Sequence, residues 1–358
     1  MPGGIPYIIA NEAAERFSFY GMKAILSIFM VQYLWLMGDA PTEQMSEVLA
    51  SENYHKFNKW VYATPFFGAL LADFFFGKYR VIIWLSIVYC VGHACLALMG
   101  VSGSAGWWLF AGLSLICVGS GGIKPCVSAH VGDQFGKSNQ HLLTKVFNWF
   151  YFSINLGAFL SMLATPWILE WHGPHLAFGI PGVLMAIATL FFWLGRKKFI
   201  HIQPDSKKFK RELCSKEGLG VILRLLPLYF FVAFFWALFD QTGSSWVFQS
   251  QDMDRHFVID WLPSQIQSIN SVLILTLVPL FTFFVYPTLE KFIKLTPLRK
   301  IGVGLFITVF AFSIIALIQV SISEGNTPNI GWQFLAYLFL TAAEVMVSIV
   351  CLEYSYTQ

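Results

Sequence analysis

Charged residues are scarce in this sequence. They make up 12% of its 358 residues, whereas an average soluble domain has about 25%. Hydrophobic residues account for 56%, and apolar stretches of about twenty residues, the length needed to cross a bilayer, recur along the whole chain. These features exclude an ordinary soluble domain and predict an all-α polytopic membrane protein. The net charge of +3 is too small to indicate a nucleic-acid partner.

Several patterns are absent. The six cysteines have no CxxC or paired spacing, so we interpret them as packing residues that form neither a disulfide nor a metal site. The first ten residues contain no basic region and no cleavable signal pattern. No HExxH zinc pair, no serine in a nucleophile context and no second membrane aspartate to face Asp240 is present, which argues against a membrane-embedded peptidase. The glycines before Lys124 are not followed by Gly-Lys-Ser/Thr, so they are not a nucleotide-binding loop.

The apolar stretches predict ten membrane spans, separated by segments that contain Pro, Gly or charged residues. The expected spans are residues 8–37, 56–77, 81–100, 107–131, 143–168, 176–195, 220–248, 266–289, 299–320 and 331–353. Most of the 23 Lys and Arg residues follow the even-numbered spans, and the opposite loops are acidic. By the positive-inside rule, the N-terminus and the even-numbered loops are expected to be cytoplasmic.

The longest of these loops, residues 196–219, divides the chain. We expect an N-terminal six-helix bundle over residues 1–195, this basic cytoplasmic linker, and a C-terminal bundle over residues 220–358 with four helices present. The run from Lys207 to Arg211 favours a solvated interdomain helix, with binding to anionic lipid as the alternative. A two-bundle transporter with its binding site between the halves has this organisation.

Three charged residues lie close together in the first predicted helix. Glu12, Arg16 and Tyr20 are spaced by four residues, which places them on one helical face, and Glu15 flanks that face. Ionised groups in a helix of this length usually face a polar cavity and mark a path for a substrate or an ion. The alternative is an interfacial helix end, from which the charged groups reach the lipid headgroups.

A few ionisable residues lie in the other predicted spans. Lys59 and Lys124 are cations of the first half, whereas Asp240 and Glu344 are anions of the second half. Each could be a structural charge with one fixed partner, but together they suit a zwitterion with separated ends. Proton coupling needs carboxylates or histidines that exchange a proton for a salt bridge. The residues that qualify are Glu12, Glu15, Asp240 and His55.

Several long motifs resemble those of one transporter family. Residues 12–21 (EAAERFSFYG) are similar to the first-helix motif ExxERFxYYG of the proton-dependent oligopeptide transporter family, which belongs to the major facilitator superfamily. The same family is matched by residues 68–80 (GALLADFFFGKYR), 119–135 (GSGGIKPCVSAHVGDQF), 150–157 (FYFSINLG), 235–244 (FWALFDQTGS) and 343–345 (AEV). The resemblance extends over the whole chain.

The resemblance implies a proton-coupled symporter that imports di- and tripeptides by alternating access. It implies that Arg16 and Lys124 hold the peptide carboxylate, while Glu344, Asn155 and Asn270 meet the amino group. Residues expected to line the site are Tyr20, Tyr62, Trp236 and Ser348, although a membrane tryptophan is more often a packing residue. The expected proton-coupling and gating residues are Glu12, Glu15, Arg16, His55, Lys124 and Asp240.

Other expectations follow from the same resemblance. No cofactor, metal or catalytic role is expected, and protons are the coupling ion. The functional unit is expected to be a monomer in the plasma membrane, with a bacterial inner membrane favoured. Phe19 replaces a tyrosine of the motif, and the chain stops after ten helices where members of the family have twelve, which indicates a truncated sequence. The alternative function is proton-coupled transport of another small nitrogenous solute, such as an amino acid or nitrate.

Overall fold

The computed structural model describes residues 1–38, 43–137, 139–204, 206 and 215–357. The chain divides into two compact units, residues 1–212 and 213–358, which are described separately below. The basic run Lys207–Arg211, for which the sequence favours a helix, lies outside the described residues.

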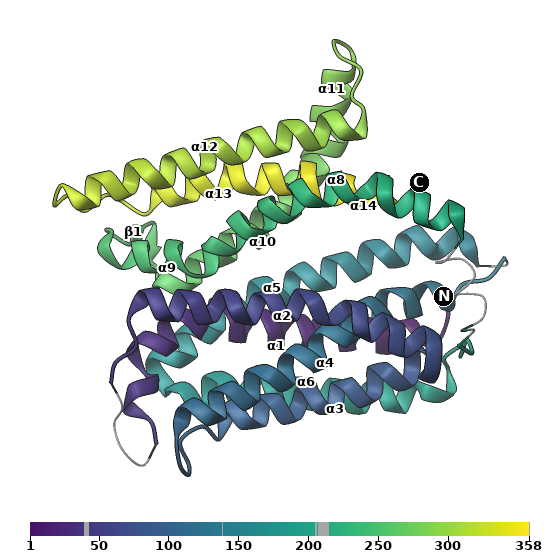
Figure 1. The fold of residues 1–358 in the computed structure, drawn as a ribbon, viewed down its shortest axis with the longest axis horizontal. Helices are drawn as coiled ribbons and strands as arrows, with labels where there is room; N and C mark the ends of the chain where they lie inside the picture. The colour runs from purple at the N-terminus through teal and green to yellow at the C-terminus, as the bar shows by residue number, and fades with distance from the viewer. Residues whose placement is uncertain (39–42, 138, 205, 207–214, 358) are drawn as a thin grey trace. The chain divides into compact units, whose positions relative to one another are not determined.

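Six long helices make up most of the described part of the first unit (Figure 1). They are α1 (Ile5–Gln32), α2 (Glu47–Leu71), α3 (Lys78–Ala97), α4 (Ala105–Asp133), α5 (Leu143–His172) and α6 (Pro174–Leu194). A π-helical turn at Ala72–Phe76 continues α2 almost to the start of α3. Within this unit, α4 packs against α2 and α3, and α1 packs against α5 and α6.

The second unit is also helical. Its helices are α8 (Lys216–Phe239), α9 (Ser245–Gln249), α10 (Ser268–Leu280), α11 (Tyr286–Glu290), α12 (Pro297–Ser323), α13 (Gly331–Glu344) and α14 (Val350–Thr357). Two two-residue strands, β1 (His256–Phe257) and β2 (Ile259–Asp260), pair antiparallel in the loop after α9. Long helices α12 and α13 lie side by side (Figure 1).

The structure confirms the predicted class, an all-α polytopic membrane protein. Eight helical segments of the described chain are long and apolar enough to cross a membrane. The other two long helices, α1 and α2, have 28 and 25 residues and carry the charged groups considered below.

Some predicted boundaries differ from the helices. The second helix begins at Glu47 instead of residue 56, because Ser46 caps it by accepting a hydrogen bond from the Leu49 N–H, and its first turns are polar. The first helix ends at Gln32 instead of residue 37 and is followed by a short 3-10 turn. The seventh predicted span is interrupted after Phe239 by a 3-10 turn that begins with Asp240. A hydropathy pattern does not detect such local changes of helical type.

The glycines before Lys124 allow close helix packing. A Cβ atom on Gly68 of α2 would lie 2.7 Å from the Gly122 carbonyl oxygen and 2.9 Å from its carbonyl carbon. A Cβ atom on Gly119 would lie 2.8 Å from the Leu85 carbonyl oxygen on α3. These glycines therefore let α4 approach both neighbours closely, which confirms the packing interpretation of this motif.

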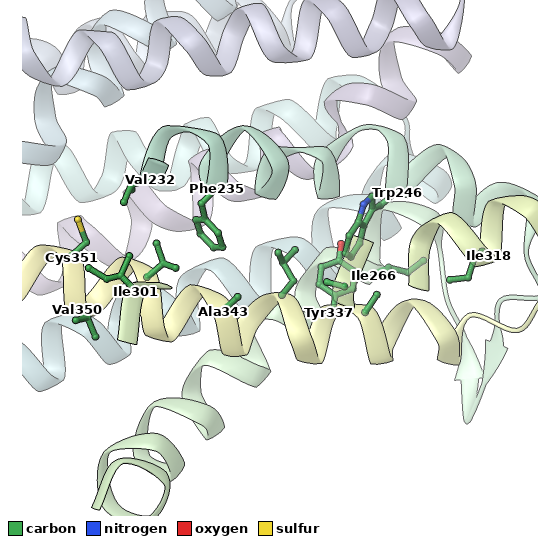
Figure 2. Close-up of a cluster of buried hydrophobic side chains, with 14 of the residues drawn as sticks. Val232, Phe235, Trp246, Ile266, Ile301, Ile318, Tyr337, Ala343, Val350 and Cys351 are labelled. Atoms are coloured by element: carbon green, nitrogen blue, oxygen red, sulfur yellow. The ribbon is translucent and has the colours of Figure 1, made fainter. Parts of the chain in front are cut away.

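A buried hydrophobic cluster holds the second unit together (Figure 2). The rings of Trp246 on α9 and Tyr337 on α13 meet edge to face, with their centroids 4.9 Å apart. Beside them, the fully buried Gln333 side chain donates hydrogen bonds to the Trp246 carbonyl oxygen and to Gln249 Oε1. The ring contact and the two hydrogen bonds together hold α9 against α13.

Candidate functional site

The charged residues of α1 form a compact cluster. Arg16 Nε lies 2.7 Å from Glu12 Oε1 and 3.4 Å from Glu15 Oε2. The two carboxylate side chains are almost completely buried, and that of Arg16 is 13% exposed. Glu12 and Arg16, which the sequence places on one helical face, therefore form an ion pair, and Glu15 shares the same guanidinium group.

Helix α4 contributes two further residues, Ser120 and Lys124, to this cluster. The Ser120 hydroxyl donates a 2.7 Å hydrogen bond to Glu15 Oε1. One helical turn further along, the Lys124 ammonium lies 3.6 Å from the centroid of the Phe19 ring, a cation–π contact. Lys124 also interacts electrostatically with Glu12, Glu15 and Arg16. The structure thus brings together four residues predicted from sequence, on two helices whose charged positions are about 110 residues apart.

Aromatic rings surround these charges. Phe19, at the position where the family motif has tyrosine, is buried and stacks against Phe57, with ring centroids 6.3 Å apart. Tyr20 meets the Phe19 ring edge-on at 5.5 Å. Since Phe19 supports Lys124 through its ring face, the missing hydroxyl leaves this contact intact.

A second cation, Lys23, lies further along α1. Its ammonium is above the rings of Tyr54, at 5.5 Å, and Tyr62, at 5.8 Å, both on α2. His55 contacts the Tyr54 ring edge-on. Lys23 was not assigned to the predicted site, although its seven-residue spacing from Arg16 places both on one face of α1. Ser120 was also missed, and its only sequence signal is its place within the glycine-rich motif.

Asn155 lies on α5 and is 9% exposed. Its amide donates a 2.9 Å hydrogen bond to the Tyr151 carbonyl oxygen, one turn earlier on the same helix. Helix α5 approaches α1 closely, because a Cβ atom on Gly157 would lie 2.6 Å from the Ala13 carbonyl oxygen. The glycine in this motif therefore serves helix packing.

In the second unit, Glu344 and Asn270 form a polar pair between α13 and α10. The Asn270 amide donates to Glu344 Oε2 at 2.8 Å and to Thr341 Oγ1 at 3.1 Å. A π-helical turn, Val345–Ile349, begins directly after Glu344 and contains Ser348. Such turns are frequent at functional sites. Thr341 had not been predicted, although it lies one helical turn before Glu344.

The last two predicted residues lie near the end of α8. Asp240 is 5% exposed and begins the 3-10 turn that ends this helix. Trp236, one turn earlier, makes ring contacts with Phe235 and Phe239 at 5.5 and 5.2 Å. These contacts agree with the packing alternative for Trp236. Among the described residues, no group of three or more His, Cys, Asp and Glu side chains is placed to hold a metal ion.

The apolar helices and the buried charged residues described above define a polytopic helical membrane protein with charged groups inside its helix bundles. The model of the POT family matches residues 79–217 and 212–358, which is most of the sequence. The chain belongs to the POT family.

Individual relatives agree with this assignment. Human solute carrier family 15 member 2 is 35% identical over 98% of this chain and 53% of its own length. Peptide transporter 3 of Caenorhabditis elegans is 35% identical over 90% of this chain and 51% of its length. The chain therefore spans about half the length of these curated relatives.

Solved structures show the same fold. The structure of the POT family transporter PepTSo has a TM-score of 0.90 and 38% identity, and the match covers all of this chain and 84% of that one. A crystal structure of a proton dependent oligopeptide (POT) family transporter has a TM-score of 0.83 and 37% identity, with 99% and 85% covered.

Proposed function

We propose that this protein is a proton-coupled symporter that imports di- and tripeptides by alternating access. In this proposal Arg16 and Lys124 hold the peptide carboxylate, and Glu344, Asn155 and Asn270 meet the amino group. Two observations support it: the chain belongs to a family whose named relatives include a peptide transporter, and the buried charges leave a positive excess in the first unit and carboxylates in the second.

The division of charge is the observation that carries the proposal. In the first unit, Arg16 and Lys124 interact with two carboxylates, Glu12 and Glu15. Lys23, which lies over two tyrosine rings, is a third cation and leaves an excess of positive charge. In the second unit, the hydrogen bond accepted by Glu344 comes from the neutral amide of Asn270. Because a buried charge is costly unless it is paired, each set favours a ligand group of opposite sign. A peptide zwitterion supplies both.

Proton coupling follows from the same groups. A proton taken up by Glu12 or Glu15 removes a negative charge beside Arg16 and so frees the guanidinium for the peptide carboxylate. Asp240 and His55 are the other residues proposed to exchange protons. A charge that crosses the membrane potential gains about 2.3 kcal/mol per 100 mV, which is enough to drive accumulation. No cofactor and no enzymatic activity are proposed.

The same proposal includes a cellular setting. The basic loops support a cytoplasmic N-terminus in a plasma membrane, with a bacterial inner membrane favoured. The functional unit is proposed to be a monomer.

The test is uptake of labelled dialanine into liposomes that contain the purified protein and have an inward proton gradient. We expect accumulation that collapses with a protonophore and is competed by tripeptides but not by free alanine or nitrate. Accumulation of nitrate or an amino acid, without dialanine uptake, would contradict peptide transport and support the alternative solute class.

A matched pair of variants tests the assigned residues. Lys124→Ala should abolish or gravely weaken dialanine uptake, because it removes a proposed carboxylate ligand. Lys56→Ala is the control: it removes a lysine that is 61% exposed and paired with Glu52, and uptake should stay near that of the wild type. Wild-type uptake by a properly inserted Lys124→Ala protein would remove Lys124 from the site.

A further inference from the structure

A separate pocket lies in the first unit, where the basic loops gather. Its volume is about 370 Å³, and three segments of the described chain line it. They are residues 75–80 at the start of α3, His130 and Asp133 near the end of α4, and residues 201–204 after α6. None of the residues assigned to peptide binding or proton coupling lines this pocket.

The N-terminus of α3 opens into the pocket. This helix begins at Lys78 after Gly77, whose φ of 76° lies in the left-handed region, a conformation that favours glycine. No side chain caps the helix. In its first backbone hydrogen bond, the Val81 N–H donates to the Gly77 carbonyl oxygen. The N–H groups of the first turn therefore remain available to an anion.

Most of the ionisable side chains in the described lining of this pocket are basic. Lys78 Nζ is held by both carboxylate oxygens of Asp133, at 2.9 and 2.8 Å, so that pair is neutral. Arg80 is exposed and forms no ion pair with any residue that the structure describes. His201 adds a second imidazole beside that of His130. Because the pair of Lys78 and Asp133 is neutral, Arg80 gives the described lining of the pocket an excess of positive charge.

A buried polar atom also lacks a partner here. His130 is 2% exposed, and its Nε2 has no hydrogen-bond partner within the described chain. An unpaired buried nitrogen costs free energy. His130 also lines the pocket, so its ring lies next to the space that an anion would occupy.

The wall formed by residues 201–204 is held in position. The Gln134 side chain accepts a hydrogen bond from the Ile200 N–H at 2.9 Å and donates one to the Ile200 carbonyl oxygen at 3.2 Å. The rings of Tyr79 and His201 meet edge to face, 4.8 Å apart. The three segments are therefore connected without a ligand, so binding would cost little reorganisation.

We propose that this pocket binds a phosphate group. The uncapped helix N-terminus and the Arg80 guanidinium are donors that suit phosphate oxygens. The imidazole of His201, whose Nε2 lies 2.9 Å from the Arg196 carbonyl oxygen, can offer its Nδ1. Two sources have this chemistry: the headgroup of an anionic phospholipid in the adjacent leaflet, and a soluble phosphate compound. Bound phosphate would connect the start of α3 to the segment after α6 and stabilise this end of the unit.

The test measures thermal unfolding of the purified protein in a neutral maltoside detergent at constant ionic strength. Three probes are titrated: dioctanoyl phosphatidic acid, inorganic phosphate, and dioctanoylglycerol, which is the same lipid without the phosphate. Saturable stabilisation by phosphatidic acid alone supports the proposal with a lipid source. Stabilisation by inorganic phosphate supports it with a soluble source. No stabilisation by either phosphate probe, or equal stabilisation by dioctanoylglycerol, would overturn it.

Variants locate the effect. Arg80→Gln and His201→Gln should each weaken the apparent affinity at least about tenfold, equivalent to about 1.4 kcal/mol. Lys145→Gln is the control, because Lys145 is exposed on α5 near the same end and does not line the pocket. An unchanged affinity in Arg80→Gln and His201→Gln, or an equal loss in Lys145→Gln, would overturn the assignment. Arg80 and His201 are both exposed, and the unfolding temperature without ligand shows whether each variant is folded.

Discussion

Ser120 offers a direct test of how the buried Glu15 carboxylate is held. Its hydroxyl is completely buried and donates a 2.7 Å hydrogen bond to Glu15 Oε1. The other oxygen, Oε2, is 3.4 Å from Arg16 Nε. The substitution Ser120→Ala removes one hydroxyl without adding an atom, so the helices can keep their positions while Glu15 loses its donor from α4.

The expected cost follows from the charge and the burial. A hydrogen bond to a charged group contributes about 1.5–3 kcal/mol, and a buried acceptor left without its donor loses about that much. We therefore expect Ser120→Ala to lower the unfolding temperature by several degrees, since about 1 kcal/mol corresponds to roughly 2–4 °C in a domain of 150–250 residues.

Transport should change in a characteristic way. The substitution removes the Ser120 hydrogen bond from the ionised form of Glu15 and leaves its interactions with Arg16 and Lys124, so the proposed exchange of a proton at Glu15 should be impaired. We expect proton-driven accumulation of dialanine in liposomes to fall, while exchange of internal for external peptide is largely kept.

Ser128→Ala is the matched control. Ser128 is on the same helix, is exposed, and donates only to the Pro125 carbonyl oxygen of its own helix, at 3.4 Å. This control should leave stability and accumulation near wild type. If Ser120→Ala behaved like Ser128→Ala in both assays, the bond from Ser120 to Glu15 would have no role in holding the ionised carboxylate.

Three further predictions concern packing and loop stability. Gly68→Ala should destabilise the protein by about 1–3 kcal/mol in thermal unfolding, because its methyl group meets backbone atoms of α4. Gly132→Ala, where nothing lies within 4 Å of the added carbon, should be neutral or stabilising; equal losses would refute the steric argument. Gln333→Leu should cost about 1–3 kcal/mol, since two buried acceptors lose their donor. Finally, hydrogen bonds from the His256 N–H and the Asn329 amide lower the pKa of Asp254. These bonds therefore stabilise the folded protein at a pH above the ordinary aspartate pKa of about 4, and this stabilisation is lost as the pH falls. Asn329→Ala should therefore reduce the fall in unfolding temperature between about pH 5 and pH 3, and an unchanged fall would contradict this assignment.

Much of the fold could be predicted from the sequence, because hydropathy and helix length are local properties. The apolar stretches gave the helical membrane class, and the glycines of the 119–122 segment indicated close packing that the structure confirms. Helix ends were less predictable. The start of α2 depends on the Ser46 cap and on polar turns, and the break at Asp240 depends on a change to 3-10 geometry, neither of which alters mean hydropathy.

The site was predictable only within single helices. The four-residue spacing of Glu12 and Arg16 fixes their pairing, because such residues are neighbours on a helix surface. The contacts of Ser120 with Glu15, and of Asn270 with Glu344, join residues 105 and 74 positions apart. Helical periodicity shows which face a residue occupies but not which helix covers that face, so neither hydrogen bond could be derived from spacing.

The two carboxylates of α1 therefore have different structural connections. Glu12 pairs with Arg16 on its own helix, so a proton on Glu12 changes a contact inside α1. Glu15 binds both Arg16 and the Ser120 hydroxyl, so a proton on Glu15 also changes the contact between α1 and α4. Lys124, which lies one turn beyond Ser120, rests on Phe19 of α1. Because helix packing changes in discrete steps, Glu15 is the carboxylate whose protonation would act directly on the hydrogen bond between α1 and the helix that carries Lys124.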